Sequence, residues 1–372
     1  MSTSKRNYRV LIAGGTGGHV FPAISIADAL RDINPDVELL FVGTRDKMEW
    51  HAVPNAGYKI KSVWISGFHR RPTLKNLSFP FKLVTSIAQS VGILNAFKPD
   101  VVVSCGGFAA GPVSWVAEKR GIPVVIQEQN SFPGVTNRLL ADKAKVIFTA
   151  FEQADQYLPK GKTLLLGNPT RKSLQKATGN EAYESFGFSP KKQTLLILGG
   201  SGGAKSLNQA MTTWVDQLHN DLGLQIIWQC GTRYFEEVRQ TVKPENYENL
   251  RLSDFLDNMP HVFAVSDLVI SRAGASSCAE LLITGKPSVL VPSPHVAGDH
   301  QTKNGKAMLE NGAAVLLEDK HLDSKLFDTV SGLIHNELEL EQMSRKARQL
   351  AKPDAAESIA REIIEMIDKR EA

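Results

Sequence analysis

The sequence is poor in cysteine, with only three among its 372 residues. Cys105, Cys230 and Cys278 lie far apart, and no two of them form a C-x-x-C pair. An odd and scattered set of cysteines argues against a disulfide framework, and the missing C-x-x-C spacing argues against a zinc site. We therefore expect a protein of the reducing cytoplasm.

Long apolar runs are also missing. The longest uncharged windows, residues 83–97 and 101–117, are too short to span a membrane, and the second contains Gly106, Gly107 and Pro112. The apolar run 8–13 is too short for the core of a signal peptide. We expect no segment that crosses a bilayer, whereas attachment to a membrane surface stays open.

The charge excess is small. A formal net charge of +4 is too weak to predict nucleic-acid binding, so we expect no nucleic-acid partner. The same charge suits an anionic small ligand or an anionic membrane surface.

Two common nucleotide-binding spacings are absent from the first glycine-rich turn, Gly14-Gly15-Thr16-Gly17-Gly18-His19. It is not G-x-G-x-x-G, because Val20 occupies the third glycine position, and no Gly-Lys-Ser/Thr of a P-loop follows. Hydride-transfer enzymes and P-loop phosphohydrolases are therefore disfavoured. Glycines after a strand still let backbone N–H groups approach a ligand at a helix start. A tight turn that binds nothing is the alternative interpretation.

Metal-binding patterns are absent too. No D-x-D occurs, and no His/Asp cluster has the spacing of a metal site. We expect a site without metal or cofactor, in which helix starts, backbone amides and Arg171 meet the charge of a diphosphate.

Short apolar runs alternate with helical patterns along the whole chain. The runs are 9–13, 39–42, 59–63, 101–104, 123–126 and 146–149 in the first half, and 194–198, 225–229, 268–271, 288–291 and 314–317 in the second. Helical patterns over 21–33, 205–218 and 275–284 lie between them. Such runs suit strands buried on both faces of a parallel sheet, so we predict an α/β fold with ligands at the carboxyl ends of the strands.

The beginning of the fold is repeated. A second turn, Gly199-Gly200-Ser201-Gly202-Gly203, also follows an apolar run and opens an amphipathic helix. Two such starts about 185 residues apart predict two doubly wound halves. We predict one domain over residues 1–170 plus 356–372, where the last helix returns, and another over 171–355.

Several polar residues follow the predicted strands. His19 stands at a helix start, which disfavours imidazolium and suits a general base for a sugar hydroxyl. Glu128 and Asn130 follow run 123–126, and Gln301 follows run 288–291. Glu280 lies early in the helix predicted over 275–284, where a carboxylate can accept from a ribose diol. A capping, packing or solvated role is the alternative for each of these residues.

Seven segments, in order, resemble one family of enzymes. They are GGTGGHVFPAISIADAL, SGF at Ser66, PDVVVSCGGFAAGP, IPVVIQEQN, GNPTR, GGSGGAKSLN and SRAGASSCAE. Over residues 9–367 the chain is similar to the bacterial UDP-N-acetylglucosamine–N-acetylmuramyl-(pentapeptide) pyrophosphoryl-undecaprenol N-acetylglucosamine transferases. The resemblance implies a GT-B fold, in which two Rossmann-like domains face each other across a cleft.

The resemblance also implies a function in peptidoglycan biosynthesis. The reaction would be an inverting transfer of N-acetylglucosamine from UDP-N-acetylglucosamine to the 4-hydroxyl of the muramyl sugar of lipid I, giving lipid II and UDP. The first domain would take the acceptor and attach peripherally to the cytoplasmic face of the cell membrane, and the second would bind the donor. The stretch 68–97, which mixes bulky apolar residues with Arg70, Arg71, Lys75 and Lys82, could rest on anionic inner-leaflet lipids. A core-facing helix with a solvated basic face is the alternative interpretation of this stretch.

Site residues carried over by motif divide between the two domains. In the first domain Thr16, Gly17 and Gly18 would lie near the sugar and diphosphate, His19 would be the base, and Asn130 would touch the donor sugar. Glu128 is the reserve candidate for the base. In the second domain the implied nucleotide and donor-sugar contacts are Arg171, Ser201, Leu256, Ala275, Ser276, Ser277, Cys278, Ala279, Glu280 and Gln301. The family often has Gln-Gln where this chain has His300-Gln301, so His300 is the alternative sugar contact.

Two other functions stay open at the level of sequence. A UDP-N-acetylglucosamine 2-epimerase would share the fold but needs acid–base groups around C2 and no lipid acceptor. A non-catalytic nucleotide-sugar-binding scaffold of the division machinery would bind the donor without releasing UDP.

Overall fold

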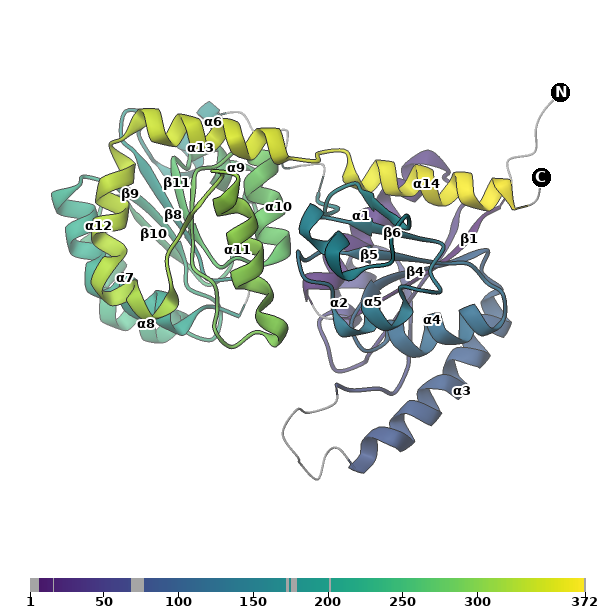
Figure 1. Ribbon diagram of the computed structural model, residues 1–372. Helices are drawn as coiled ribbons and strands as arrows, with labels where there is room; N and C mark the ends of the chain where they lie inside the picture. The colour runs from purple at the N-terminus through teal and green to yellow at the C-terminus, as the bar shows by residue number, and fades with distance from the viewer. Residues whose placement is uncertain are drawn as a thin grey trace. The chain divides into compact units, whose positions relative to one another are not determined.

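The computed structural model describes residues 7–15, 17–67, 77–171, 174, 179–200 and 202–370. The chain divides into two compact units, Met1–Thr170 with Pro353–Ala372, and Arg171–Lys352 (Figure 1). The boundary at which the chain returns to the first unit lies before Pro353, a few residues earlier than the predicted boundary between residues 355 and 356. Thr16, Ser201 and residues 68–76 of the predicted membrane stretch lie outside the described residues.

The first unit is built on a parallel sheet whose described strands follow the order β3-β2-β1-β4-β5-β6-β7. The strands are β1 (Arg9–Gly14), β2 (Glu38–Gly43), β3 (Lys59–Ser62), β4 (Val101–Gly106), β5 (Val124–Glu128), β6 (Val146–Thr149) and β7 (Thr163–Leu165). The helices are α1 (Gly17–Ile33), α2 (Glu49–Asn55), α3 (Phe79–Phe97), α4 (Ala110–Lys119), α5 (Val135–Leu140) and α14 (Ala355–Lys369), with the 3-10 turn η2 (Glu152–Tyr157).

Strand β1 shows why these runs form central strands. Val10 and Ile12 belong to a core cluster with α1 and α14, whereas Leu11 and Ala13 belong to a second cluster with α3 and α4. All four side chains are fully buried. Because each large aliphatic side chain contributes about 1.5–3 kcal/mol on burial, a strand with two apolar faces is stable only between two helical layers.

The C-terminal helix completes the first unit. Ile359 and Ile363 of α14 lie in the same core cluster as Ile26 and Leu30 of α1, and Figure 1 shows the two helices side by side. None of the described helices is both long and apolar enough to cross a membrane.

The second unit repeats the plan, and its described strands follow the order β10-β9-β8-β11-β12-β13. The strands are β8 (Thr194–Leu198), β9 (Gln225–Gln229), β10 (Leu250–Ser253), β11 (Leu268–Ser271), β12 (Ser288–Leu290) and β13 (Val315–Leu316). The α-helices are α6 (Gly179–Phe186), α7 (Lys205–Asp216), α8 (Phe235–Val242), α9 (Met259–Val265), α10 (Ala275–Thr284), α11 (His300–Glu310), α12 (Leu322–Ile334) and α13 (Glu337–Leu350). The short turns are η4 (Gln217–Asp221), η5 (Pro244–Asn246), η6 (Ala297–Asp299) and η7 (Asp319–His321).

Each sheet has a point where the strand order reverses. In the first unit it lies between β1 and β4, and in the second between β8 and β11. Connections on the two sides of such a point leave the sheet in opposite directions, which opens a crevice at the carboxyl ends of the strands. Both glycine turns found in the sequence lie at these points, because they lie at the carboxyl ends of β1 and β8.

Candidate functional site

In the first unit the loop after β4 packs against the loop after β1, and glycines form the contact. Gly106 and Gly107 have positive φ angles of 92° and 84°. A Cβ on Gly107 would lie 2.9 Å from the Gly15 carbonyl oxygen, and one on Gly106 would lie 2.9 Å from Cδ2 of His19. Only glycine satisfies both the conformation and the contact, so the third glycine cluster holds the first turn in place.

His19 is the third residue of α1, because the helix begins at Gly17 rather than at the predicted position 21. Its Nδ1 lies 2.6 Å from the Gly15 carbonyl oxygen. Since a carbonyl only accepts hydrogen bonds, Nδ1 carries the proton, and Nε2 is then the basic atom of the neutral ring. The positive end of α1 further disfavours imidazolium.

Glu128 ends β5 and is buried. Its Oε1 accepts from the backbone N (2.9 Å) and Nδ2 (3.2 Å) of Asn130. Its Oε2 accepts from the backbone N of Gly134 (3.0 Å) and from Nδ2 of Asn137 (2.8 Å). The carboxylate therefore fixes Asn130 and the first turn of α5 together.

A second buried carboxylate, that of Glu49, lies against the first glycine turn. Glu49 accepts at Oε1 from the backbone N (3.0 Å) and hydroxyl (2.8 Å) of Thr44. A Cβ on Gly15 would lie 3.1 Å from the same oxygen. Glu49 therefore fills the space beneath Gly15 and limits where this turn can move.

In the second unit the glycine turn after β8 packs against the end of β9. A Cβ on Gly231 would lie 2.3 Å from the Cα of Gly203, and one on Gly203 would lie 2.2 Å from the Cys230 carbonyl oxygen. An added Cβ on Gly200 or Gly202 would meet nothing within 4 Å. The turn is thus packed tightly at Gly203, whereas Gly200 and Gly202 leave space in which a ligand can approach their backbone.

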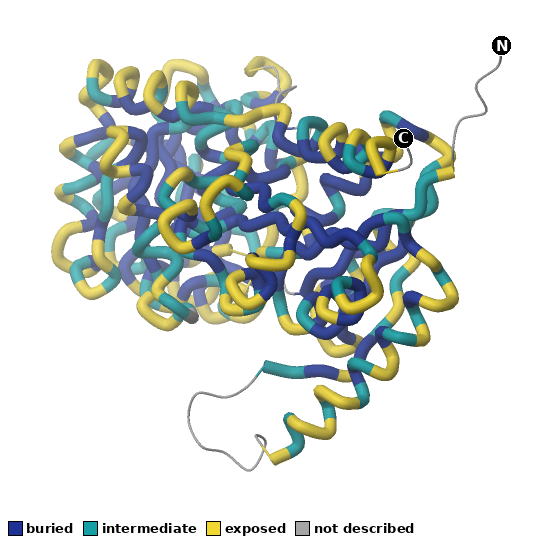
Figure 2. The backbone as a smooth tube through the Cα atoms, turned by 45° about the vertical axis from the view of Figure 1, so that its right-hand side comes forward, coloured by how far each residue is buried: buried dark blue, intermediate teal, exposed yellow. Residues whose placement is uncertain are grey.

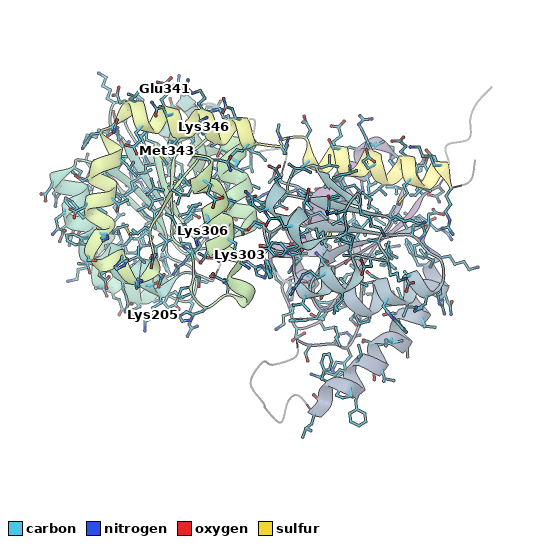
Figure 3. All side chains as sticks on the ribbon, viewed as in Figure 1. Lys205, Lys303, Lys306, Glu341, Met343 and Lys346 are labelled. Atoms are coloured by element: carbon cyan, nitrogen blue, oxygen red, sulfur yellow. The ribbon has the colours of Figure 1, made fainter. Side chains whose placement is uncertain are left out.

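Two helices begin at this switch point without a side-chain cap. The residue before α7 is Ala204, and the residue before α10 is Gly274. The first N–H groups of a helix have no partner inside it, so uncapped starts suit an anion such as a diphosphate. Lys205 opens α7, and Lys303 and Lys306 lie on α11 (Figure 3), which adds positive charge to this unit.

An arginine absent from the predicted site links these parts. Arg272, directly after β11, donates to Asp319 (2.5 Å) and to the Ser206 hydroxyl (2.8 Å). Ser206 in turn donates to Asp319 (2.7 Å). The network ties the first turn of α7 to the end of β11. The three residues of the network are far apart in the sequence, so the sequence does not reveal it. The only signal for Arg272 is its position directly after a predicted strand.

Six predicted contacts lie on α10. Ala275, Ser276 and Ser277 form its start, and the Ser276 hydroxyl is buried without a hydrogen-bond partner in the described part of the chain. Cys278 is buried in the core, and its N–H already donates to the Gly274 carbonyl. Burial raises the pKa of the Cys278 thiol to about 12, so the thiol stays protonated. Cys278 and the buried Ala279 therefore pack beneath the helix start rather than offer polar atoms to a ligand.

Glu280 is the last of this group, with its side chain 18% exposed. Burial raises the pKa of the Glu280 carboxyl, and the nearby Arg171 guanidinium opposes that rise. Nη2 of Arg171 lies 3.8 Å from Oε1 of Glu280. The structure thus brings together two predicted contacts that are far apart in the sequence.

The remaining predicted contacts follow β10 and β12. Leu256 lies between β10 and α9, and no hydrogen bond within the described residues reaches its backbone N–H or carbonyl. Gln301, in the first turn of α11, accepts at Oε1 from the backbone N of Ser293 (2.8 Å). That bond orients the amide and leaves its NH₂ as the end that can donate to a sugar. The His300 ring instead packs against Gly298.

Both halves of the chain match one glycosyltransferase family. Residues 9–149 match the Glycosyltransferase family 28 N-terminal domain, and residues 194–359 match the Glycosyltransferase family 28 C-terminal domain. The first match contains β1 to β6 and the second contains β8 to β13, so each includes the switch point of one sheet.

Full-length relatives carry one enzyme name. UDP-N-acetylglucosamine–N-acetylmuramyl-(pentapeptide) pyrophosphoryl-undecaprenol N-acetylglucosamine transferase of Flavobacterium psychrophilum is 46% identical, and the alignment covers 98% of each chain. The enzyme of the same name from Parabacteroides distasonis is 43% identical over 98% of this chain and all of its own. The crystal structure of Acinetobacter baumannii MurG, 30% identical, has a TM-score of 0.75 over 98% of this chain and all of that one. The fold is therefore GT-B, and the chain belongs to glycosyltransferase family 28 and, within it, to the UDP-N-acetylglucosamine–N-acetylmuramyl-(pentapeptide) pyrophosphoryl-undecaprenol N-acetylglucosamine transferases.

Proposed function

We propose that this chain transfers N-acetylglucosamine from UDP-N-acetylglucosamine to the 4-hydroxyl of the muramyl sugar of lipid I, forming lipid II and UDP. The observation that carries the proposal is 46% identity over 98% of both chains with a relative of that name. The two uncapped helix starts of the second unit, which suit a diphosphate, support it independently.

His19 acts as the general base in this proposal. Its Nδ1–H is held by the Gly15 carbonyl, so Nε2 is the atom that takes the proton of the acceptor hydroxyl. The oxygen then attacks the anomeric carbon from the face opposite UDP, the new glycosidic bond forms, and the bond to the diphosphate oxygen breaks with inversion. The electron pair of that bond leaves with UDP.

Glu128 is better suited to positioning than to proton transfer. Both of its oxygens already accept hydrogen bonds, from four donors in all. Taking a proton would break at least one of these bonds. Glu128 therefore orients Asn130 toward the donor sugar, and His19 carries the proton. Thr16, Gly17 and Gly18 belong to the same sugar-side group by their motif.

The second unit holds the nucleotide. The starts of α7 and α10, with Ser201 and Arg171, take the diphosphate and stabilise the negative charge that grows on it as the sugar leaves. Glu280 accepts from the ribose hydroxyls, and the backbone of Leu256 pairs with uracil. Gln301, oriented by Ser293, donates to the sugar.

Exposed apolar side chains on three neighbouring helices of the first unit support attachment to the membrane. Phe81 and Val84 of α3 are 72% and 67% exposed, Trp115 of α4 is 46% exposed, and Leu139 of α5 is 78% exposed. Helix α4 packs against both α3 and α5, and Figure 2 shows exposed residues recurring along α3. With Lys82, Lys119 and Arg138 among them, these helices suit the anionic cytoplasmic leaflet.

The test of the function is UDP release from UDP-N-acetylglucosamine with and without a lipid I analogue. Transfer predicts release that depends on the analogue, together with a disaccharide product. Formation of a 2-epimer from the donor alone would identify an epimerase instead, and donor binding without UDP release would identify a scaffold.

A further inference from the structure

The free edge of the first sheet carries a groove that none of the proposed catalytic roles uses. Strand β3 is the outermost of the described strands on its side of the sheet, next to β2. A cavity of about 940 Å³ runs along it, floored by β2 and β3 and walled by the C-terminal half of α3. That volume is near the upper end of the roughly 300–1,000 Å³ typical of ligand sites.

The register shows which backbone groups face outward. Val63 N donates to the Gly43 carbonyl (3.0 Å), so Lys59, Lys61 and Val63 direct their backbone groups toward β2. In a parallel ladder the alternate residues point the other way. Ile60 and Ser62 therefore offer two N–H and two C=O groups to the groove, and no hydrogen bond within the described residues occupies them.

The next outward-facing backbone group along the chain already has a partner within the protein. The next outward N–H, that of Trp64, donates to the Gln89 side chain of α3 (2.7 Å). The same helix stands away from β3 beside this contact, because a Cβ added to Gly92 would meet nothing within 4 Å. Space for one more extended segment thus lies between α3 and the open part of the edge.

Positive charge lines the groove. Lys59 and Lys61 are exposed on β3, and Arg31 and Arg45 also line the cavity. The arginines lie over the rings of Tyr58 (4.1 Å) and Trp50 (5.6 Å), which hold them in place.

The acidic member of the lining is already paired. Glu38 lies 3.4 Å from Nε of Arg9 and accepts from Asn7. The lining therefore has an excess of cations, whose natural complement is a run of carboxylates.

We propose that this edge is a docking site for an acidic, extended peptide segment of a partner protein, which adds as a strand beside β3. Backbone pairing at Ile60 and Ser62 supplies the register, and the lysines and arginines select carboxylates on the incoming strand. The exposed apolar residues Phe81 and Val84 lie at the other end of α3, so the groove is separate from the proposed membrane face.

The test uses the full chain and a fluorescein-labelled eight-residue peptide of alternating glutamate and valine, followed by fluorescence polarisation. The peptide should bind, and a lysine–valine peptide of equal length should not. Lys59→Glu with Lys61→Glu should weaken binding at least about tenfold, since attraction becomes repulsion. Lys145→Glu with Lys160→Glu makes the same charge change outside the cavity lining and should leave binding unchanged.

Two further measurements separate strand addition from simple charge attraction. Gly92→Phe fills the groove without changing charge and should abolish binding, and hydrogen exchange at Ile60 and Ser62 should slow when the peptide is bound. Equal weakening by both double variants, or binding without slower exchange, would overturn the proposal. The proposal would also be overturned if the Lys59/Lys61 double variant lost binding to phosphatidylglycerol vesicles but still bound the peptide. The lysines of the groove would then contact the membrane rather than a peptide.

Discussion

The Nδ1 atom of His19 lies 2.6 Å from the carbonyl oxygen of Gly15, four residues earlier in the chain. This contact decides the tautomer, because the carbonyl can only accept and the proton must sit on Nδ1. The glycine turn therefore does more than admit a ligand. It holds a proton on Nδ1 of a helix-start histidine, which leaves Nε2 as the nitrogen that can accept another.

His19→Ala should lower kcat by about 10²–10⁴-fold, the range for loss of one general base. The KM for UDP-N-acetylglucosamine should change little, because the proposed nucleotide contacts lie in the second unit. The measurement is UDP release with saturating donor and lipid I analogue. Near-normal turnover would remove His19 as the base.

Glu128→Gln should destabilise the protein by about 1–3 kcal/mol, because the amide NH₂ replaces an oxygen that now accepts two hydrogen bonds. Thermal or urea unfolding measures this cost. The acid side of the kcat–pH profile should survive in the variant if His19 is the base. A normally stable variant that loses this limb would instead identify Glu128 as the base.

Gly106→Ala should impair catalysis, since its Cβ would meet the His19 ring at 2.9 Å. Gly121→Ala is the matched control, with a positive φ of 69° and no atom within 4 Å of the added Cβ. Both variants should lose about 1–2 kcal/mol of stability from the left-handed conformation. Only Gly106→Ala should also lose kcat, and equal activity in the two would mean that the contact does not position His19.

The fold follows closely from local pattern where strands are buried on both faces. The apolar runs 146–149, 194–198, 225–229 and 268–271 are strands with the predicted bounds. Strands β7 and β10 were not predicted. Both are at sheet edges, where one side of the strand needs no partner and the apolar signal is weak.

Only those residues of the candidate site that belong to recognisable sequence motifs were predictable. His19 lies at a helix start, and Glu280 lies within the first two turns of a helix, at positions that the sequence displays. Two of the four donors to Glu128, Gly134 N and Asn137 Nδ2, become apparent only once α5 folds back onto β5, and the Arg272–Asp319 pair spans 47 residues. Buried networks of this kind depend on tertiary packing, which local sequence does not report.

Glu280→Gln should raise the KM for UDP-N-acetylglucosamine by about tenfold, because a charged acceptor for the ribose hydroxyls is lost. The same change should raise the Tm of the ligand-free protein at neutral pH. Burial raises the pKa of Glu280 in the folded state, so the ionised form costs stability above that raised pKa. The cost disappears as the pH falls below the pKa of the unfolded chain.

The gain in Tm over the unsubstituted protein should therefore shrink in acid. The donor KM of the unsubstituted protein should rise as the pH falls through the raised pKa, whereas that of Glu280→Gln should stay nearly flat. A variant with a lower Tm and an unchanged KM would place Glu280 in a structural role.

Replacing Phe81 and Val84 together by serine should weaken binding to anionic vesicles without affecting transfer to a water-soluble acceptor. These side chains are 72% and 67% exposed on α3, so their removal opens no core cavity and stability should stay unchanged. Co-sedimentation with phosphatidylglycerol vesicles measures the loss of binding. Each apolar side chain contributes about 1.5–3 kcal/mol when it is fully desolvated. Side chains at a membrane surface are desolvated only in part, so we expect binding to weaken about tenfold. Leu338→Ser is the control, because Leu338 is 66% exposed on α13 of the second unit. If that control lost as much vesicle binding as the double variant, general surface hydrophobicity rather than the α3–α5 face would hold the protein to the membrane.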